Sequence, residues 1–396
     1  MGKQVLQLLI AGGGIGGMAA ALACVRAGCG VQLLERAAAF NEVGAGIQIG
    51  PNVTRLLHGW GLQAALDAVA AFPQRLQVRD ALSSRELGVL ALGASMQQRY
   101  GAPYATVHRA DLHRLLHTAA AQQAQVSLLL NQELQHCTQT PDAVTVRTAA
   151  WEEFTGDALV GADGLWSPVR QWLLHDGPPR ATGHLAYRAL VRQAGLPAQL
   201  RSQQVTVWLG PQLHVVQYPV RGGDWLNLVA IVHGQLLGQS TNLDNWDHSA
   251  NAAELRSTMA GTCAPLQDLV QAVDAWRLWV LCDRPPMQSA QQQAQGRVAL
   301  LGDAAHPMRP YLAQGAGMAI EDAAALADAL GQTTDVPAAL AAYAQQRWQR
   351  NARVQARSAR NGKIFHATGL VRWGRDRAMQ LGGERLMDLP WLYGAR

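Results

Sequence analysis

A glycine-rich segment near the N-terminus carries the most specific chemistry in the chain. Gly12, Gly14 and Gly17 form the pattern GxGxxG, and Glu35 follows at the spacing of an acidic partner. In a dinucleotide-binding turn the first glycine allows the turn, the second lets a pyrophosphate approach the backbone, and the third permits close packing of helix on strand. Glu35 would accept hydrogen bonds from ribose hydroxyls and would repel a 2′-phosphate. The segment therefore predicts a site for FAD or NAD rather than NADP.

The elements that such a turn requires lie on either side of it. Residues 6–11 form a short apolar run, residues 18–27 form an alanine-rich stretch that ends at Gly28, and residues 31–34 form a second apolar run. They predict a strand, a helix and a second strand, with the N–H groups of the helix N-terminus facing the phosphates. A glycine-rich turn that binds no ligand is the alternative, and it does not explain Glu35.

Two more carboxylates follow apolar runs later in the chain. Asp163 lies in the segment GADG and Asp303 in the segment GDAAHP. A loop through Gly315 and Ala316 then leads into a helix predicted over about 318–330. Because open α/β sheets bind ligands at the C-terminal ends of their strands, both carboxylates are candidate ligand contacts. A plain turn residue is the alternative for Asp163.

Composition excludes several classes of protein. With 396 residues, 49% of them hydrophobic and 15% charged, the chain can bury a large core over two or three domains and is not expected to be disordered. The net charge of +5 is modest for this length. The densest basic run predicts one stripe on a helix, which is usually a solvated or subunit-facing surface rather than a nucleic-acid contact. Its members are Arg347, Arg350, Arg353, Arg357 and Arg360.

The cysteines and the apolar segments favour a cytoplasmic protein without a membrane span. The five cysteines are scattered and include no CxxC pair, which argues against a disulfide framework or a zinc ribbon and suits a reducing compartment. The N-terminal apolar stretch imitates a secretory signal, but the glycines over 12–17 would break such a helix. No other apolar stretch approaches ~20 residues.

Two other kinds of chemistry are disfavoured. His113 and His117 would lie one helical turn apart, but Arg114 replaces the glutamate of the HExxH motif, so no metal is expected there. The chain contains no GxSxG segment, which disfavours a hydrolase of the nucleophile-elbow type.

The GxGxxG pattern, the GADG segment and the GDAAHP segment, in this order and at these separations, resemble the motifs of the single-component FAD-dependent aromatic hydroxylases. The resemblance covers almost the whole chain, including the segments 210–223 and 389–394, and is strongest toward salicylate hydroxylases and 3-hydroxybenzoate 6-hydroxylases. It implies hydroxylation of a small carboxylated phenol, with NADH or NADPH as transient electron donor and O₂ as co-substrate, through a C4a-hydroperoxyflavin. The chain has no second GxGxxG, so the donor would have no dinucleotide domain of its own.

The resemblance also implies a fold. We expect a doubly wound α/β FAD-binding domain with an inserted antiparallel-sheet substrate domain and a helical C-terminus. The discontinuous FAD-binding domain would comprise residues 1–73, 102–181 and 283–345. The substrate-binding domain would comprise residues 74–101 and 182–282, and the helical C-terminal segment residues 346–396. Apolar runs over 205–233, separated by glycine pairs, agree with strands in the inserted domain.

A set of cofactor contacts follows from the same resemblance. Arg109 would contact the phosphate and ribityl region of FAD, Asp303 the ribityl hydroxyls, and Asp163 the region between the pyrophosphate and the transient nicotinamide site. Gly315 and Ala316 would place N–H groups at the pyrimidine end of the flavin, where a helix N-terminus favours negative charge. The remaining members of the set are Gly12, Gly14, Gly17, Glu35, Arg36, Gln48 and Leu134.

His214 and Tyr218 are the candidate catalytic residues. They lie in a predicted strand and share a face with Val216, because side chains alternate along a strand. The resemblance implies that both contact the substrate and that His214 assists deprotonation of the phenol, which makes the ring a stronger carbon nucleophile. An ordinary core or surface histidine is the alternative.

Four further residues are candidates for the substrate pocket. Gln48 stands where 6-hydroxynicotinate hydroxylases carry a histidine, and Pro310 stands where 3-hydroxybenzoate 6-hydroxylases carry a glutamine. Arg309 could bind or steer a carboxylate, and Tyr104 could line the pocket or be a core tyrosine. The differences at Gln48 and Pro310 leave open which position of the ring is hydroxylated.

Two other functions stay open on this sequence. One is a flavin oxidase, epoxidase or quinone-pathway hydroxylase on the same fold. The other is a non-enzymatic regulatory flavoprotein that uses the arginine stripe to bind nucleic acid. A monomer and a homodimer are both compatible with the sequence.

Overall fold

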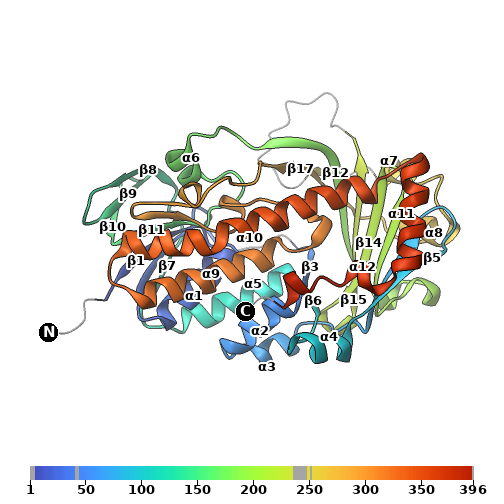
Figure 1. Ribbon diagram of the computed structural model, residues 1–396, viewed down its shortest axis with the longest axis horizontal. Coiled ribbons are helices and arrows are strands. Elements are labelled where there is room, and N and C mark those ends of the chain that lie inside the picture. The colour runs from blue at the N-terminus through green and yellow to red at the C-terminus, as the bar shows by residue number, and fades with distance from the viewer. Residues whose placement is uncertain (1–4, 41–43, 235–247, 250–251, 395–396) are drawn as a thin grey trace. The chain divides into compact units, whose positions relative to one another are not determined.

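The computed structural model describes residues 5–40, 44–234, 248–249 and 252–394 (Figure 1). These residues form two compact units, each assembled from separate stretches of the chain. The first unit draws on residues 1–43, 110–180 and 283–358, and the second on residues 44–109, 181–282 and 359–396. Each unit has its own main sheet and its own hydrophobic core.

The first unit is built on a six-stranded sheet with the strand order β18-β19-β11-β1-β2-β7. The pairs from β19 through to β7 are parallel, and β18 is an antiparallel edge strand. A parallel sheet is covered on both faces, so its strands are continuous apolar runs, which is why the sequence predicted several of them. The strands are β1 (Gln7–Ala11), β2 (Gly30–Leu34), β7 (Val126–Leu129), β11 (Ala158–Gly161), β18 (Ala294–Gln295) and β19 (Val298–Leu300).

Two alanine-rich helices of this unit, α1 (Ile15–Arg26) and α9 (Gly315–Gln332), pack against each other. A small antiparallel sheet of order β10-β9-β8 contributes to the hydrophobic core of the first unit, where Leu134 packs with Leu9 and Leu34. Leu134 therefore has a core role, and its contact with adenine stays a prediction. The other elements are α5 (Arg109–Ala121), α6 (Pro168–Leu174), β8 (Leu134–Gln139), β9 (Val144–Thr148), β10 (Glu153–Gly156), η4 (Ala290–Gln292), η5 (Gly302–Ala304), η6 (Pro310–Leu312) and α10 (Val336–Phe365).

A buried ion network joins α9 to α10. The Asp322 carboxylate is fully buried and accepts hydrogen bonds from Nε of Arg347 at 2.7 Å and from Nδ2 of Asn351 at 3.0 Å. His306 lies 2.5 Å from the same carboxylate, and Glu321 accepts from Nη1 of Arg347 at 2.9 Å. Each charge in the network therefore has a partner of opposite sign, as burial requires.

This network corrects the prediction that the arginine stripe is a surface feature. Arg347 is only 5% exposed, and Arg350 donates to both carboxylate oxygens of Glu321. Arg353 and Arg360 are exposed, as a solvated stripe would be. The charge pattern of α10 could not reveal that two acidic residues of α9 lie opposite it.

The second unit is built on an eight-stranded sheet with the strand order β16-β17-β12-β15-β14-β13-β4-β5. The expected antiparallel pairs run from β12 through β15 and β14 to β13, and one parallel pair joins β13 to β4. The strands are β4 (Arg75–Asp80), β5 (Glu86–Ala91), β12 (Arg180–Arg192), β13 (Val205–Gly210), β14 (Leu213–Val220), β15 (Trp225–His233), β16 (His248–Ser249) and β17 (Arg277–Asp283).

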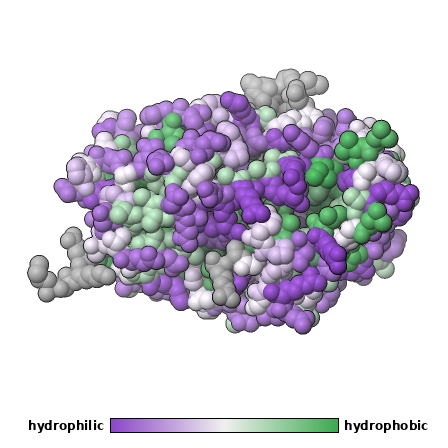
Figure 2. Space-filling view, viewed as in Figure 1, coloured by the Kyte–Doolittle hydropathy of each residue, from purple (hydrophilic) through white to green (hydrophobic). Residues whose placement is uncertain are grey.

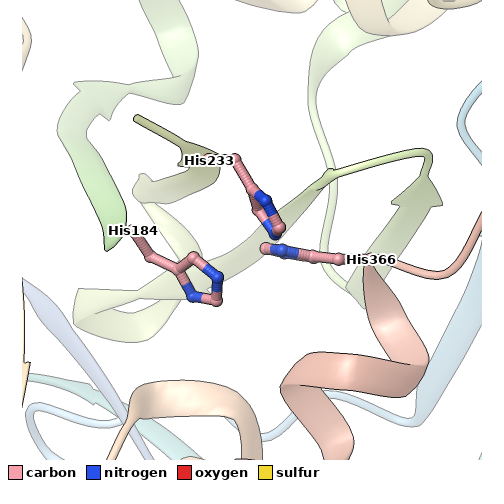
Figure 3. Close-up of side chains that lie close together, drawn as sticks. All are labelled: His184, His233 and His366. Carbon is pink, nitrogen blue, oxygen red and sulfur yellow. The ribbon is translucent and has the colours of Figure 1, made fainter. Parts of the chain in front are cut away.

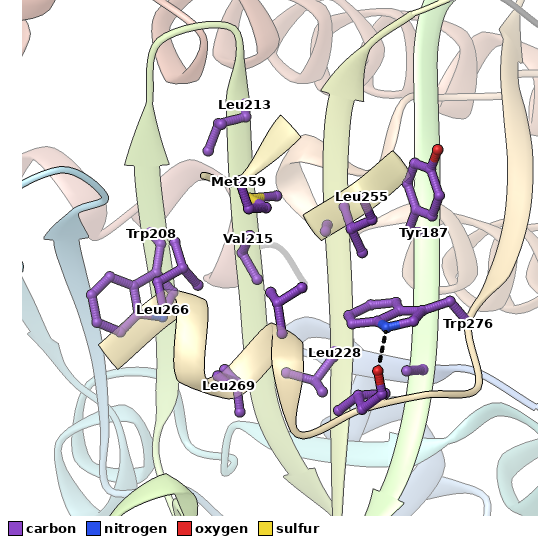
Figure 4. Close-up of a cluster of buried hydrophobic side chains, with 14 of the residues drawn as sticks. Tyr187, Trp208, Leu213, Val215, Leu228, Leu255, Met259, Leu266, Leu269 and Trp276 are labelled. Atoms are coloured by element: carbon purple, nitrogen blue, oxygen red, sulfur yellow. Dashed lines mark hydrogen bonds between the residues drawn. The ribbon is translucent and has the colours of Figure 1, made fainter. Parts of the chain in front are cut away.

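One face of this sheet carries the hydrophobic core of the second unit (Figure 4). Leu213 and Val215 of β14 and Leu228 of β15 pack there with side chains from α7 (Ala252–Thr258) and α8 (Ala264–Gln271). Trp276 joins this core and donates from Nε1 to the carbonyl oxygen of Val273 at 3.0 Å. Because side chains alternate along a strand, the neighbours of these residues point to the opposite face.

A two-stranded ribbon and several short helices complete the second unit. Apolar side chains of α11 (Gly369–Gly382) are exposed, namely Leu370, Val371, Trp373 and Leu381. Figure 2 shows green, hydrophobic surface at the right-hand end of the view, where Figure 1 places α11. None of the helices that the structure describes is both long and apolar enough to cross a membrane. The other elements are β3 (Gly46–Ile49), α2 (Pro51–Gly59), α3 (Gln63–Asp67), α4 (Gly93–Tyr100), β6 (Ala105–His108), η1 (Gln193–Gly195), η2 (Ala198–Leu200), η3 (Arg221–Gly223), α12 (Glu384–Met387) and α13 (Pro390–Tyr393).

The two units divide the chain differently from the predicted domains. Residues 44–73 and 102–109 group with the second unit, and the last boundary falls at 358, within α10. The reason is pairing over long sequence distances. Strand β3 pairs with β6, and the N–H of Gly46 donates to Oδ1 of Asn227 on β15 at 2.6 Å.

Candidate active site

The glycine-rich turn of the first unit has the shape that its sequence predicts. Gly12 has a φ of 98°, a conformation that side chains disfavour, and a Cβ on it would lie 2.6 Å from the carbonyl oxygen of Ala162. A Cβ on Gly17 would lie 1.9 Å from the carbonyl oxygen of Gly12. Gly14 is the N-cap of α1 and contributes no side chain that could occupy the first turn. No side chain of these glycines would therefore keep a phosphate from the N-terminus of α1.

Replacing Gly17 with alanine should abolish cofactor binding, because its Cβ would overlap the Gly12 carbonyl group. We expect the purified variant to lack the flavin absorbance that the parent protein shows per mole of chain. Gly374→Ala is the matched control, since nothing lies within 4 Å of a Cβ at that position. Circular dichroism distinguishes lost binding from lost folding, and a folded Gly17→Ala variant with a full complement of flavin would refute the assigned role of the turn.

Two side chains hold the turn in place. The Glu35 carboxylate accepts from the N–H of Gly13 at 2.6 Å through Oε2 and from the N–H of Ala37 at 2.8 Å through Oε1. His113 of α5 lies with Nε2 2.6 Å from the carbonyl oxygen of Gly13. The contact between His113 and Gly13 was not predicted, because no local sequence pattern links residue 113 to the turn. Glu35 keeps further acceptor capacity on both oxygens for ribose hydroxyls.

Asp163 has an unsatisfied atom beside this turn. Its Oδ2 accepts from the N–H of Val169 at 3.1 Å, whereas its Oδ1 is buried and has no hydrogen-bond partner among the described residues. Burial raises the pKa of Asp163 to about 6, against the opposing effects of Ser167, Val169 and the exposed Arg36. A buried oxygen without a donor is costly, so this position fits a ligand that supplies one.

The N-terminus of α9 lies beside the second predicted carboxylate. Gln314 is the N-cap, and Gly315 and Ala316 begin the helix, so their N–H groups form its positive end. A Cβ on Gly315 would lie 3.9 Å from Oδ1 of Asp303, which places the two predicted residues next to each other. Together with the turn and Asp163, this arrangement fits an extended dinucleotide that carries a flavin.

In the second unit, the sheet face opposite the hydrophobic core carries His214, Val216 and Tyr218. All three belong to β14, and their neighbours Leu213 and Val215 pack in the core. His214 is 1% exposed and Tyr218 is 3% exposed. The two residues are four positions apart on the strand and have different neighbours.

His214 lies in a cluster of histidines. Its Nδ1 is 2.7 Å from Nε2 of His366, and which ring donates depends on the tautomers. Phe365 contacts the same imidazole, with ring centroids 5.4 Å apart. Burial, assisted by His184, lowers the pKa of His214 to about 3. The imidazole is therefore neutral near pH 7.

Tyr218 lies at the other end of the strand. A Cβ on Gly46 would lie 2.5 Å from Cε2 of Tyr218 and 2.7 Å from Cγ of Asn227, so glycine is required where β3 passes these side chains. Burial raises the pKa of Tyr218, although the nearby Arg188 opposes this shift. Tyr218 therefore keeps its hydroxyl proton and can donate a hydrogen bond.

Arg188 of β12 is a candidate that sequence reasoning missed. It stacks on Trp279 with the guanidinium 4.4 Å from the ring centroid, and its Nε is buried without a hydrogen-bond partner among the described residues. Burial lowers the pKa of Arg188 to about 10, with Arg109 also lowering it and Tyr218 opposing. A cation with an unsatisfied donor beside Tyr218 fits an anionic ligand. The available signal was one charged residue within the strand segment AYRALV.

The structure brings two of the predicted pocket residues together. The buried Tyr104 donates from its hydroxyl to Oε1 of Gln48 at 2.7 Å. Tyr393, from the C-terminal tail, lies against Tyr104 with ring centroids 6.4 Å apart. Arg109 is fixed through its backbone, which donates to the carbonyl oxygen of Ala45 at 2.7 Å.

Arg309 and Pro310 belong to the first unit, where Pro310 begins the short helix η6. Nε of Arg309 donates to Oδ2 of Asp283 at 2.6 Å. Much of the Arg309 charge is therefore already neutralised, which makes Arg188 the stronger candidate for holding a carboxylate.

Comparison with known proteins agrees with this geometry. The family model of an FAD binding domain matches residues 5–358. A 3-hydroxybenzoate 6-hydroxylase from Polaromonas naphthalenivorans is 37% identical over 393 residues, covering 98% of this chain and 96% of that protein. A 3-amino-4-hydroxybenzoate 2-monooxygenase from Streptomyces platensis is also 37% identical, with 98% and 96% of the two chains covered.

Solved structures show the same fold. Klebsiella pneumoniae HpxO, complexed with FAD and uric acid, matches with a TM-score of 0.85 and 26% identity over 96% of this chain and 94% of that chain. A salicylate hydroxylase in a substrate complex matches with a TM-score of 0.83 and 25% identity over 99% and 96% of the chains. The glycine-rich turn, the unsatisfied Asp163 and the whole-chain similarity lead to one assignment. The chain belongs to the FAD-binding family of flavin-dependent monooxygenases.

Proposed function

We propose that this monooxygenase hydroxylates a phenol that carries a carboxylate, of the 3-hydroxybenzoate or salicylate type, with NADH or NADPH as electron donor. The observation that carries the proposal is the similarity to 3-hydroxybenzoate 6-hydroxylases along almost the whole chain. The buried Nε of Arg188, which has no hydrogen-bond partner among the described residues and lies beside Tyr218, supports an anionic substrate. Bound FAD would supply the transfer of electrons from the donor and the activation of O₂.

His214 would take the proton of the substrate hydroxyl group. Its imidazole is neutral near pH 7 because burial lowers its pKa to about 3, so it is in the accepting form. Nδ1 is engaged by His366, so the substrate proton would go to Nε2, in the tautomer in which Nδ1 carries hydrogen and donates to His366. The negative charge of a bound substrate would favour the protonated imidazole and offset part of the effect of burial. Removing the proton makes the ring a stronger carbon nucleophile.

Arg188 and Tyr218 would hold the substrate. The pKa of Arg188, about 10, keeps the guanidinium charged near pH 7, and Tyr218 keeps its hydroxyl proton. Charge-assisted hydrogen bonds from a guanidinium to a carboxylate are among the stronger ones in proteins. These two side chains would therefore select carboxylated phenols over neutral ones.

Replacing Arg188 with glutamine should raise KM for the carboxylated substrate about 10–100-fold, since a hydrogen bond to a charged group is worth ~1.5–3 kcal/mol. KM for a phenol without a carboxylate should stay unchanged, which a general structural defect would not produce. Arg192→Gln is the matched control, because Arg192 lies on the same strand and also stacks on a tryptophan, Trp225, at 5.5 Å. Equal effects of both substitutions would contradict the assignment.

A substrate panel tests the function directly. Purified protein is supplied with NADH or NADPH, O₂ and 3-hydroxybenzoate, salicylate, 3-amino-4-hydroxybenzoate or plain phenol, and the products are identified by mass spectrometry and NMR. We expect a carboxylated phenol to accelerate donor oxidation and to gain one oxygen atom. Acceleration without a hydroxylated product identifies a pseudo-substrate. If no aromatic acid is hydroxylated, the proposal is wrong.

We also propose that the enzyme works in the cytoplasm, as a monomer or a homodimer. The scattered cysteines, without a CxxC pair, support a reducing compartment. Cell fractionation and light scattering on the purified protein test the two statements.

A further inference from the structure

Three histidines of the second unit come together at one end of the strands β12 and β15, on the sheet face that carries His214 (Figure 3). His184 of β12 and His233 of β15 are direct cross-strand partners, and His366 follows the last residue of α10. One ring nitrogen from each lies within 4.8 Å of the other two. We propose that His184, His233 and His366 form a binding site for a divalent transition-metal ion.

The spacing suits such an ion. In a tetrahedral site with metal–nitrogen distances of ~2.0–2.1 Å, the ligand nitrogens lie roughly 3.4 Å apart. The ligand nitrogens, which lie within 4.8 Å of one another, would have to approach by up to about 1.4 Å through rotations about the χ angles of the three side chains. The rings already lie close, with centroids 4.5 Å apart for His184 and His233 and 5.0 Å from each of these to His366.

The chemical state of the rings also suits a metal. Each of the three rings offers one nitrogen within 4.8 Å of the other two, and an imidazole binds a metal through the lone pair of such a nitrogen. Neutral imidazole is the form that binds metals. Arg375 is the charged side chain that bears on this cluster, and it donates to the carbonyl oxygens of Ile364 and Phe365 at 3.2 and 2.8 Å. Its charge weakens cation binding without removing any of the three ligands.

The ligand set restricts the ion. Three imidazoles without a carboxylate favour Zn²⁺, Co²⁺, Ni²⁺ or Cu²⁺ over Mg²⁺ and Ca²⁺, which prefer oxygen. His233 is exposed, whereas His184 is 9% and His366 is 6% exposed. Solvent can therefore reach the ion and complete its coordination.

Cobalt binding tests the site by a signal that does not depend on enzyme activity. Untagged, FAD-loaded protein is treated with a chelator, desalted and titrated with Co²⁺, and tetrahedral cobalt is detected by its visible bands at longer wavelength than those of flavin. We expect one ion per chain, with bands that Zn²⁺ abolishes and Mg²⁺ leaves unchanged. Calorimetry with Zn²⁺ should give the same stoichiometry.

Variants of the ligands identify the site. His233→Gln and His366→Gln should each weaken Zn²⁺ binding by at least about 100-fold, since even the loss of an outer-shell partner costs 10–100-fold. His233 is exposed, so its substitution leaves the buried core unchanged. His136→Gln, an exposed histidine outside the cluster, is the matched control and should bind as the parent protein does. Absence of the cobalt bands, or equal binding by the His233 variant, would overturn the proposal.

Discussion

Replacing His214 with asparagine should lower kcat for hydroxylation by about 10²–10⁴-fold, the usual contribution of a general base. The histidine is 1% exposed, and its Nδ1 is hydrogen-bonded to His366, so the ring is held in one orientation. Asparagine keeps a polar group at this position but cannot accept a proton near pH 7. The measurement is the initial rate of product formation, with donor oxidation followed in parallel.

Three controls make this result specific to proton transfer. The variant should retain its FAD, because His214 belongs to a different unit from the glycine-rich turn. Its deficit should shrink as the pH rises, since a phenol with a pKa near ~10 then ionises in solution without a base. His136→Asn, an exposed histidine on β8, should be fully active. A His214→Asn enzyme with normal kcat at neutral pH would remove the histidine from the mechanism.

Replacing Asp322 with alanine should destabilise the protein by about 3–5 kcal/mol, the usual cost of removing one partner from a buried ion pair. The carboxylate is fully buried and contacts His306, Arg347 and Asn351. Without it, Arg347 would keep one anionic partner among the described residues, the Glu321 carboxylate. The measurement is the free energy of unfolding from denaturant titration, with reversibility checked by refolding.

The effect should depend on pH in a defined direction. Burial alone would raise the pKa of Asp322, but His306 and Arg347 outweigh it, so the pKa lies well below the usual range. A carboxylate of this kind contributes stability above its unfolded pKa, near ~3.9, and loses it as the pH falls below that value. The parent and variant proteins should therefore converge in acid. Asp328→Asn, an exposed residue on the same helix, is the control, and an equal loss in that variant would contradict the network's role.

The local signals in this sequence gave correct predictions because they act over short distances. The strand β1, the glycine-rich turn, the helix α1 and the strand β2 follow one another between Gln7 and Leu34. Apolar runs specify the strands, and glycine is required wherever a Cβ would overlap the backbone. The strand that carries His214 and Tyr218 was predictable for the same reason.

Charge patterns were less informative about burial, because the burial of a charged side chain depends on which residues pack opposite it. The arginines of α10 indicated a surface stripe, yet Arg347 is buried against Glu321 and Asp322 of α9. Residues 44–73 were predicted to belong to the FAD-binding domain, yet the pairing of β3 with β6 groups them with the second unit. Pairing between distant segments leaves no trace in either segment alone.

The amino-acid sequence by itself determined the dinucleotide-binding turn, its acidic partner Glu35 and the family, because these depend on residue types at fixed short spacings. Only the tertiary structure decided that Arg188 lies beside Tyr218, that His366 holds His214, and that His184 and His233 join them. These residues come from strands and a helix end that are far apart in the chain, and they meet because the sheet register and the hydrophobic core fix which side chains share a face.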